Sequence, residues 1–444
     1  MRDMTKGSIL GHLIHLAAFM SVSMILQTLY FLVDLYFVSS LGKEAVAGLS
    51  LAGNLMLAVL ALTQMLGVGT TTLIAHATGR KDPAEVKLVF NQACVLSLVL
   101  GGLVTLAGYA LRWPYCQALS ADAQTVEQGA AYLFWFVAVL GLQFPLVAMG
   151  SALRGTGAVK PGLVVQVISV VINIILAPVL TVGWGTNYAM GVGGAALASL
   201  VGLTVGVSAM TYYIRTKGQV VAFDRTMWKP RPDVWRRMLN VGLPAGGEFA
   251  LFSVYGAAVY WIIRSFGASA QAGFGIGGRV MQSVFLPVMA VSFAASPLAG
   301  QNFGARQGDR VRRTFWTAAI AGSTLMAVVT LICQVSPASL VRPFTQDADV
   351  IAVAAEYLTL VSWSFVASGL NFTASGMFQA LGNTWPSLMC SASRVVFFLA
   401  PALVLASKPG FTLRQLWLLS VASTAVQAVA AVTLLQREMR RKLG

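Results

Sequence analysis

An isolated carboxylate, Asp34, stands inside the apolar segment 29–41, which reads LYFLVDLYFVSSL. A charge inside a membrane-spanning helix costs about 2.5–3.5 kcal/mol on insertion scales, so such a residue usually has a function. Burial in a low-dielectric environment disfavours the charged form, which suits a group that takes up and releases a proton. We therefore predict that Asp34 binds a coupling ion, with a structural, hydrogen-bonded carboxylate as the alternative.

Two polar residues precede Asp34 on the same predicted helix. Gln27 and Tyr30 lie seven and four residues before the acid, so all three side chains project near one helix face. They are placed to hydrogen-bond the carboxylate or to contact a substrate. The alternative for either residue alone is packing between helices.

The second half of the chain has one acid deep in an apolar segment, apart from Glu356 near the predicted start of a helix. This acid is Glu248, in the sequence GLPAGGEF. It is a candidate for binding a cationic substrate. The alternative is a salt bridge with Arg279 or Arg394, two cations inside predicted spans that both need an anionic partner.

Aromatic and methionine side chains on the predicted spans suit a cavity that accepts many ligands, since soft and flat side chains adapt to different shapes. The candidates for substrate contact are Tyr30, Phe252, Tyr255 and Met281. Lipid contact or core packing is the alternative for each.

Nothing in the sequence indicates an enzyme or a bound cofactor. The three histidines lack metal-binding spacing, no GxxxxGK[ST] motif is present, and the four cysteines are dispersed. We predict no metal site, no disulfide and no use of ATP within this chain.

Membrane helices must position these residues. Hydrophobic residues make up 57% of the 444-residue chain and charged residues only 10%, with a mean hydropathy of +0.75. This composition predicts an all-α polytopic protein embedded in a lipid bilayer. The net charge of +15 does not indicate nucleic-acid binding, because the basic residues lie in short loops between apolar segments.

Twelve apolar segments are long enough to cross a bilayer. Their approximate cores are 9–39, 46–74, 88–111, 130–149, 163–182, 192–214, 239–263, 272–297, 315–335, 351–374, 388–406 and 417–435. The first follows Arg2 and Lys6 as a signal peptide would, but its length and the absence of a small-x-small cleavage site predict a retained span. With both termini in the cytoplasm, 22 of the 30 Lys and Arg residues fall on the inner side.

The chain contains an internal repeat. A basic linker, 215–237, separates an N-terminal lobe, 1–214, from a C-terminal lobe, 238–444. One constant offset in residue number matches Gly42 with Gly267, Gly53 with Gly278, Met56 with Met281, Gly79 with Gly304, Asp122 with Asp347, Tyr132 with Tyr357, Gly157 with Gly382 and Pro161 with Pro386. Because six spans return the chain to the same side, we expect two parallel lobes related by a pseudo-twofold axis, as in alternating-access transporters.

Longer motifs recur in the two halves. The first half has VDLYFVSSLGKEAVAGLSLA, GVGTTTLIAHATGRKD and GSALRGTGAVKP, and the second has SFGASAQAGFGIGGRV, SPLAGQNFGARQGD and GMFQALGNTWP. Their combination, over nearly the whole chain, resembles the MATE (multidrug and toxic compound extrusion) family. The resemblance implies two six-helix lobes and export of organic, often cationic, compounds driven by inward flow of protons or sodium.

The resemblance also suggests which residues couple the ion. In family members with an N-lobe ion site, the first-span Asp is accompanied by an Asn and an Asp on the fifth span and a Thr on the sixth. The matching positions here are Asp34, Asn173, Ala177 and Ser199. Alanine at 177 removes an oxygen ligand, which favours protons over sodium. The two acids used by another branch fall on Phe252 and Ser368, so that second ion site is not reproduced.

These observations together predict a secondary antiporter of the inner (plasma) membrane that exports small amphipathic, often cationic, organic compounds by alternating access. Asp34, Asn173 and Ser199 are expected to couple export to protons or sodium. The expected substrate contacts are Gln27, Tyr30, Glu248, Phe252, Tyr255 and Met281. We expect a monomer without nucleic acid. The alternatives are a flippase of lipid-linked intermediates, which would need more deep basic residues, and an uncoupled channel.

Overall fold

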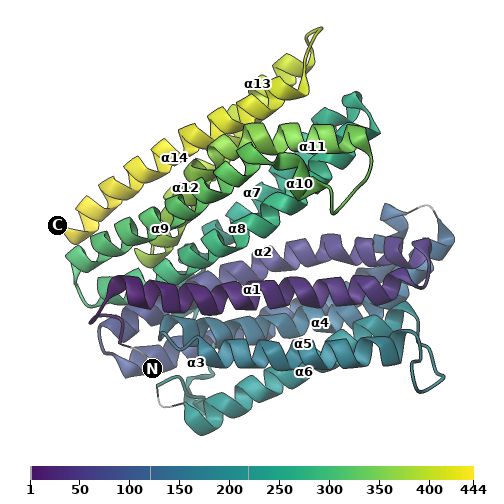
Figure 1. The fold of residues 1–444 in the computed structure, drawn as a ribbon. Coiled ribbons are helices and arrows are strands. Elements are labelled where there is room, and N and C mark those ends of the chain that lie inside the picture. The colour runs from purple at the N-terminus through teal and green to yellow at the C-terminus, as the bar shows by residue number, and fades with distance from the viewer. Residues whose placement is uncertain (1–2, 121, 219) are drawn as a thin grey trace. The chain divides into compact units, whose positions relative to one another are not determined.

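The computed structural model describes residues 3–120, 122–218 and 220–444, so Arg2 lies outside the described residues. Twelve helical segments in these ranges are long and apolar enough to cross a membrane, which confirms the predicted number of spans. Figure 1 shows the helices in chain order, from α1 in purple to α14 in yellow. The first six spans are α1 (Ile9–Ser39), α2 (Lys43–Gly79), α3 (Pro83–Leu119), α4 (Ala123–Gly155), α5 (Lys160–Thr181) and α6 (Val192–Lys217).

The second half follows the short helix η1 (Arg225–Met227). Its spans are α7 (Pro232–Ile263) extended by η2 (Arg264–Phe266), α8 (Ala268–Gly304), α9 (Gly308–Val335), then α11 (Ala348–Val361), η3 (Ser362–Ser364) and α12 (Phe365–Ala380) in one span, α13 (Trp385–Ala406) and α14 (Leu413–Leu443). The five-residue helix α10 (Pro337–Val341) lies between α9 and α11.

The repeat is visible in the backbone of the turns. Lys81 and Arg306, which the sequence offset matches, both have φ of 58°, in the left-handed region that non-glycine residues rarely adopt. Gly157 and Gly382, which are matched in the same way, have φ of 79° and 69°. The same offset therefore relates turn geometry as well as sequence, which confirms two repeated halves.

Helix starts repeat as well. The Asp122 carboxylate accepts a 2.8 Å hydrogen bond from the backbone N–H of Thr125 and caps α4. Asp347 caps α11 in the same way, with a 3.2 Å bond from the N–H of Val350, and it also accepts a 2.9 Å bond from the N–H of Asp349. An acidic N-cap satisfies otherwise unpaired N–H groups of the first turn. The two aspartates matched in sequence therefore both act as helix N-caps.

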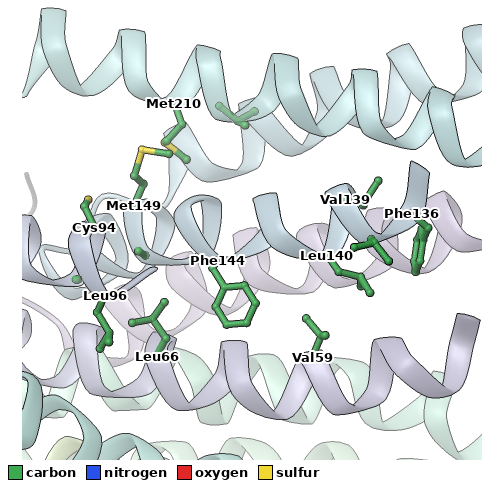
Figure 2. Close-up of a cluster of buried hydrophobic side chains, with 14 of the residues drawn as sticks. Val59, Leu66, Cys94, Leu96, Phe136, Val139, Leu140, Phe144, Met149 and Met210 are labelled. Atoms are coloured by element: carbon green, nitrogen blue, oxygen red, sulfur yellow. The ribbon is translucent and has the colours of Figure 1, made fainter. Parts of the chain in front are cut away.

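Internal packing groups the chain into two compact units. We call them the N-terminal unit, formed mainly by Phe19–Gly246, and the C-terminal unit, formed by Gly247–Gly444 together with Met4–Ala18. The N-terminal unit has a continuous apolar core. Figure 2 shows part of this core, where Phe144 lies among aliphatic side chains that include Leu66, Val59 and Leu140.

The segment after α6 is fixed on α3 within the N-terminal unit. Asn91 donates to the carbonyl of Ala222 (2.9 Å) and accepts from the N–H of Asp224 (2.9 Å). Gln92 donates to the carbonyl of Lys229 (2.9 Å). The Lys87 ammonium lies 2.8 Å from the Asp224 carboxylate and, with the Thr226 hydrogen bonds, lowers the pKa of Asp224 to about 2. This part of the predicted linker is thus an ordered element of the unit.

The C-terminal unit has its own aromatic core around Trp417, Phe365 and Phe398. The start of the chain packs into this unit. Asn302 and Arg310 both donate to the carbonyl of Met4, at 3.2 and 3.3 Å, and Arg310 also donates to the carbonyl of Gly7 (3.1 Å). The residues before α1 are therefore held by the end of α8 and the start of α9.

Candidate functional site

Asp34 lies in a closed polar cluster inside the N-terminal unit. Its side chain is 3% exposed on α1, while Asn173 on α5 and Ser199 on α6 are 0% exposed. Ser199 Oγ donates to Asp34 Oδ2 (2.7 Å), and Asn173 Nδ2 donates to Asp34 Oδ1 (3.1 Å) and to Ser199 Oγ (3.1 Å). The structure thus brings together the three residues that the sequence marked as an ion-coupling set.

Close packing of α5 against α6 forms this cluster. A Cβ atom on Gly202 would lie 2.8 Å from the carbonyl oxygen of Ser169, and one on Gly206 would lie 2.4 Å from Ser169 Oγ. Small residues let two membrane helices approach closely enough for side chains to hydrogen-bond between them. Glycine at these two places therefore sets the spacing that lets Asn173 reach Ser199.

Among the described residues, the Asp34 carboxylate has no positively charged partner within salt-bridge distance. None of the salt bridges formed within the described ranges involves Asp34. Ala177, one turn after Asn173 on α5, is 0% exposed and supplies no polar group. The Oδ1 atom of Asn173 is buried without a hydrogen-bond partner. The charge of Asp34 is therefore compensated only by two neutral donors.

Two tyrosines lie near Asp34: Tyr30, which the sequence predicts as part of the site, and Tyr132, which it does not. Tyr30 donates its hydroxyl to the backbone carbonyl of Ser199 (3.0 Å), so it braces the cluster without bonding the carboxylate. Tyr132 is 2% exposed on α4 and lies close enough to interact electrostatically with Asp34. Its only sequence signal is the match with Tyr357. Gln27 is exposed.

Glu248 is held by hydroxyl groups of the C-terminal unit. Ser375 Oγ on α12 donates to Glu248 Oε2 (2.8 Å), and Ser387 on α13 also hydrogen-bonds this carboxylate. Neither of the two arginines considered as partners forms a salt bridge with it in the described chain. Arg279 is exposed, whereas the Arg394 guanidinium lies over the ring of Tyr255, 4.5 Å from its centre.

The other predicted substrate contacts of this unit differ in exposure. Phe252, one turn after Glu248 on α7, is 69% exposed. The Tyr255 hydroxyl is 2.7 Å from Ser420 Oγ, and the Met281 sulfur accepts from the hydroxyl of Tyr357 at 2.9 Å. Tyr255 and Met281 are therefore engaged in packing inside the unit, while Phe252 is open to its surroundings.

Twelve spans in the described chain, a two-fold repeat and a buried carboxylate cluster define a membrane transporter built from two similar halves. The MatE family model matches residues 20–179 and 244–404, so the chain belongs to the MatE (MATE) family of multidrug efflux transporters and is not an enzyme.

Similar proteins agree with this assignment. The multidrug export protein MepA of Staphylococcus saprophyticus is 26% identical over 441 residues, which cover 97% of this chain and 95% of that protein. The probable multidrug resistance protein YoeA of Bacillus subtilis is 25% identical, over 79% of this chain and 76% of that protein. A solved outward-facing multidrug resistance MATE transporter aligns with a TM-score of 0.91 at 23% identity, covering 99% of this chain and 98% of the other.

Proposed function

We propose that this protein is a proton-coupled antiporter that exports small amphipathic, often cationic, organic compounds across the plasma membrane as a monomer with both termini in the cytoplasm. The observation that carries the proposal is the Asp34 carboxylate, buried on a membrane helix and bonded only to neutral donors. The names of the relatives, as multidrug export and resistance proteins, support the export of organic compounds.

Proton binding to Asp34 would reverse the direction of its hydrogen bond with Ser199, so that Asp34 donates and Ser199 accepts. The charged carboxylate accepts from both Ser199 and Asn173. A protonated carboxyl group carries an O–H that must donate, and the Ser199 hydroxyl can become its acceptor by rotating its own hydrogen away. The arrangement of donors around α1, α5 and α6 therefore depends on protonation, which supplies the two states that coupled transport requires.

Protons fit the cluster better than sodium does. Both neutral groups that face the carboxylate present hydrogen atoms, from the amide nitrogen of Asn173 and the hydroxyl of Ser199. A sodium ion would need the Ser199 hydroxyl oxygen and the Asn173 amide oxygen turned toward it in place of these hydrogen atoms. Ala177, where similar transporters carry a second acid, adds none.

Substrate contact is proposed for residues of both units. Glu248 would bind a positively charged group, because its carboxylate is held by Ser375 and Ser387 without a counter-charge. The exposed Phe252 offers a flat apolar surface next to it. The remaining proposed contacts are Tyr255, Met281, Tyr30 and Gln27.

The proposal is tested by reconstituting the purified protein into proteoliposomes and following a fluorescent organic cation. Gradients of pH and sodium are imposed separately. We expect transport to follow the pH gradient and to be lost in Asp34→Asn. Glu356→Gln, which removes a carboxylate from the exposed side of α11, is the matched control and should transport normally. Transport by Asp34→Asn that still follows the pH gradient, or transport driven by sodium alone, would refute proton coupling through Asp34.

A further inference from the structure

The repeat identifies a counterpart of the Asp34 cluster in the C-terminal unit. The constant sequence offset matches Tyr30 with Tyr255 and Tyr132 with Tyr357, so the tyrosines that surround Asp34 recur. Asp34 itself is matched by Val259, and Asn173 by Phe398. The C-terminal unit thus lacks the acid and the amide of the Asp34 cluster but keeps its two tyrosines. We call Tyr255 and Tyr357 the aromatic frame of the C-terminal unit.

A positive charge occupies this second frame. Arg394 lies one turn before Phe398 on α13, and its guanidinium is 4.5 Å from the centre of the Tyr255 ring. The Tyr255 ring is in turn 4.8 Å from the ring of Phe398. No carboxylate of the described residues forms an ion pair with Arg394. An unpaired arginine inside a membrane span is unfavourable unless it meets an anion.

Two N–H donors in this frame lack acceptors. The Nε atom of Arg394 and the Nε1 atom of Trp417 are both buried without a hydrogen-bond partner, and the Trp417 side chain is 1% exposed. Trp417 lies one turn before Ser420 on α14, and Ser420 is bonded to the hydroxyl of Tyr255. Buried donors are unfavourable unless an acceptor completes them. The N–H groups of Arg394 and Trp417 could both be satisfied by an oxygen atom that accepts a hydrogen bond.

Aromatic rings pack against the side chains that carry the two donors. The Trp417 ring stacks on Phe274 at 5.7 Å with an interplanar angle of 8°, and Tyr357 meets Trp417 edge-on at 4.8 Å. Arg394 is also close enough to Tyr357 to interact electrostatically with its hydroxyl. Such rings favour a planar, apolar body attached to the accepting group.

We propose that the C-terminal unit holds an anion-recognition site, centred on Arg394 and Trp417, that binds the carboxylate of a small aromatic or zwitterionic compound. A guanidinium binds a carboxylate through two parallel hydrogen bonds, and the indole N–H adds a third donor. The two halves of the transporter then hold opposite charges in matched frames, Asp34 in one and Arg394 in the other. That this site serves export rests on the proposed function, whereas binding does not.

Binding is measured with a matched pair of probes, 2-naphthoate and 2-naphthylmethylammonium, by equilibrium dialysis against the purified full-length protein. We expect Arg394→Gln to raise the Kd of naphthoate about tenfold, or about 1.4 kcal/mol, and to leave the Kd of the ammonium probe unchanged. Arg394→Lys keeps the charge but not the two-bond geometry, so it should retain part of the affinity. Trp417→Phe should weaken naphthoate binding by about threefold, since one neutral donor is lost.

Arg279→Gln is the control, because Arg279 is an exposed arginine on α8 of the same unit. It should bind naphthoate as the unmodified protein does. The proposal is overturned if the unmodified protein does not bind naphthoate, or if Arg394→Gln, Arg394→Lys and Trp417→Phe all bind it unchanged. Asp34→Asn should bind naphthoate normally, so failure of this site and failure of proton coupling give different results.

Discussion

Replacing Ser199 by alanine removes the shorter of the two hydrogen bonds that the Asp34 carboxylate accepts. The bond from Asn173 at 3.1 Å remains. Water cannot take the place of the lost hydroxyl without opening the unit, because Ser199 is 0% and Asp34 3% exposed. The charged form of Asp34 therefore loses one donor with nothing in exchange.

The size of the effect follows from the charge on the acceptor. A hydrogen bond to a charged group contributes about 1.5–3 kcal/mol, and about 1.4 kcal/mol corresponds to one pH unit. Because the lost bond favours the charged form, the variant should hold its proton to higher pH. The protonated form also loses Ser199 as an acceptor, which costs it about 0.5–1.5 kcal/mol for a neutral bond, so the charged form loses about 1–1.5 kcal/mol more. We therefore expect the midpoint of the pH dependence of transport to rise by about 1 pH unit.

The assay is efflux of a fluorescent cation from proteoliposomes over a series of pH values. Ser169→Ala is a closely matched control, because the Ser169 hydroxyl is buried on α5 of the same unit but has no hydrogen-bond partner. The midpoint of Ser169→Ala should equal that of the unmodified protein. The midpoint of Ser199→Thr, which keeps a hydroxyl, should lie close to the same value. A midpoint in Ser199→Ala that equals or lies below that of the unmodified protein would refute the role given to this bond.

Three further predictions concern packing, the segment after α6 and ion choice. Gly202→Val should lower the thermal unfolding temperature and weaken transport, because a Cβ there would lie 2.8 Å from a carbonyl oxygen of α5; Gly162→Ala, in open space, should change neither. The lowered pKa of Asp224 stabilises the attachment of its segment above the ordinary value of 3.8, and this is lost as pH falls toward about 2. Limited proteolysis with pepsin, with rates divided by those for an unstructured reference peptide at the same pH, should therefore cut this segment faster at pH 2 than at pH 4. Asp224→Asn should abolish this corrected difference. Ala177→Asp should let a sodium gradient drive transport; a folded variant that still responds only to pH would contradict the reason given for proton use.

Three residues that the sequence assigns to one site, Asp34, Asn173 and Ser199, are hydrogen-bonded to one another in the structure, and the reason that the sequence could indicate them is physical. An acid inside an apolar span is rare enough to be noticed, and Asn173 and Ser199 could be matched to a family pattern. Tyr132 escaped notice because a buried aromatic residue is ordinary in a membrane protein. Its contribution depends on distance to Asp34, which spacing along the chain does not give.

Partner choice was harder to predict from the sequence. The sequence offers Arg279 and Arg394 as alternative salt-bridge partners for Glu248, because opposite charges within spans usually pair. In the structure, Glu248 uses the hydroxyls of Ser375 and Ser387, and Arg394 faces an aromatic ring. Serines in a membrane helix are too common to single out. The attachment of the segment after α6 by Asn91 likewise depends on side chains that look like ordinary helix residues.

The left-handed turns at Lys81 and Arg306 have a consequence for how the chain enters the membrane. Glycine would adopt φ of 58° without strain, whereas a residue with a Cβ is disfavoured there by about 1 kcal/mol or more. Both halves nevertheless place a basic residue at this position. A positive charge in a short loop is what directs a nascent hairpin of helices to keep that loop in the cytoplasm. With both termini in the cytoplasm, as proposed above, both turns lie on the cytoplasmic side, and their basic residues suit this role when the helices on either side are inserted.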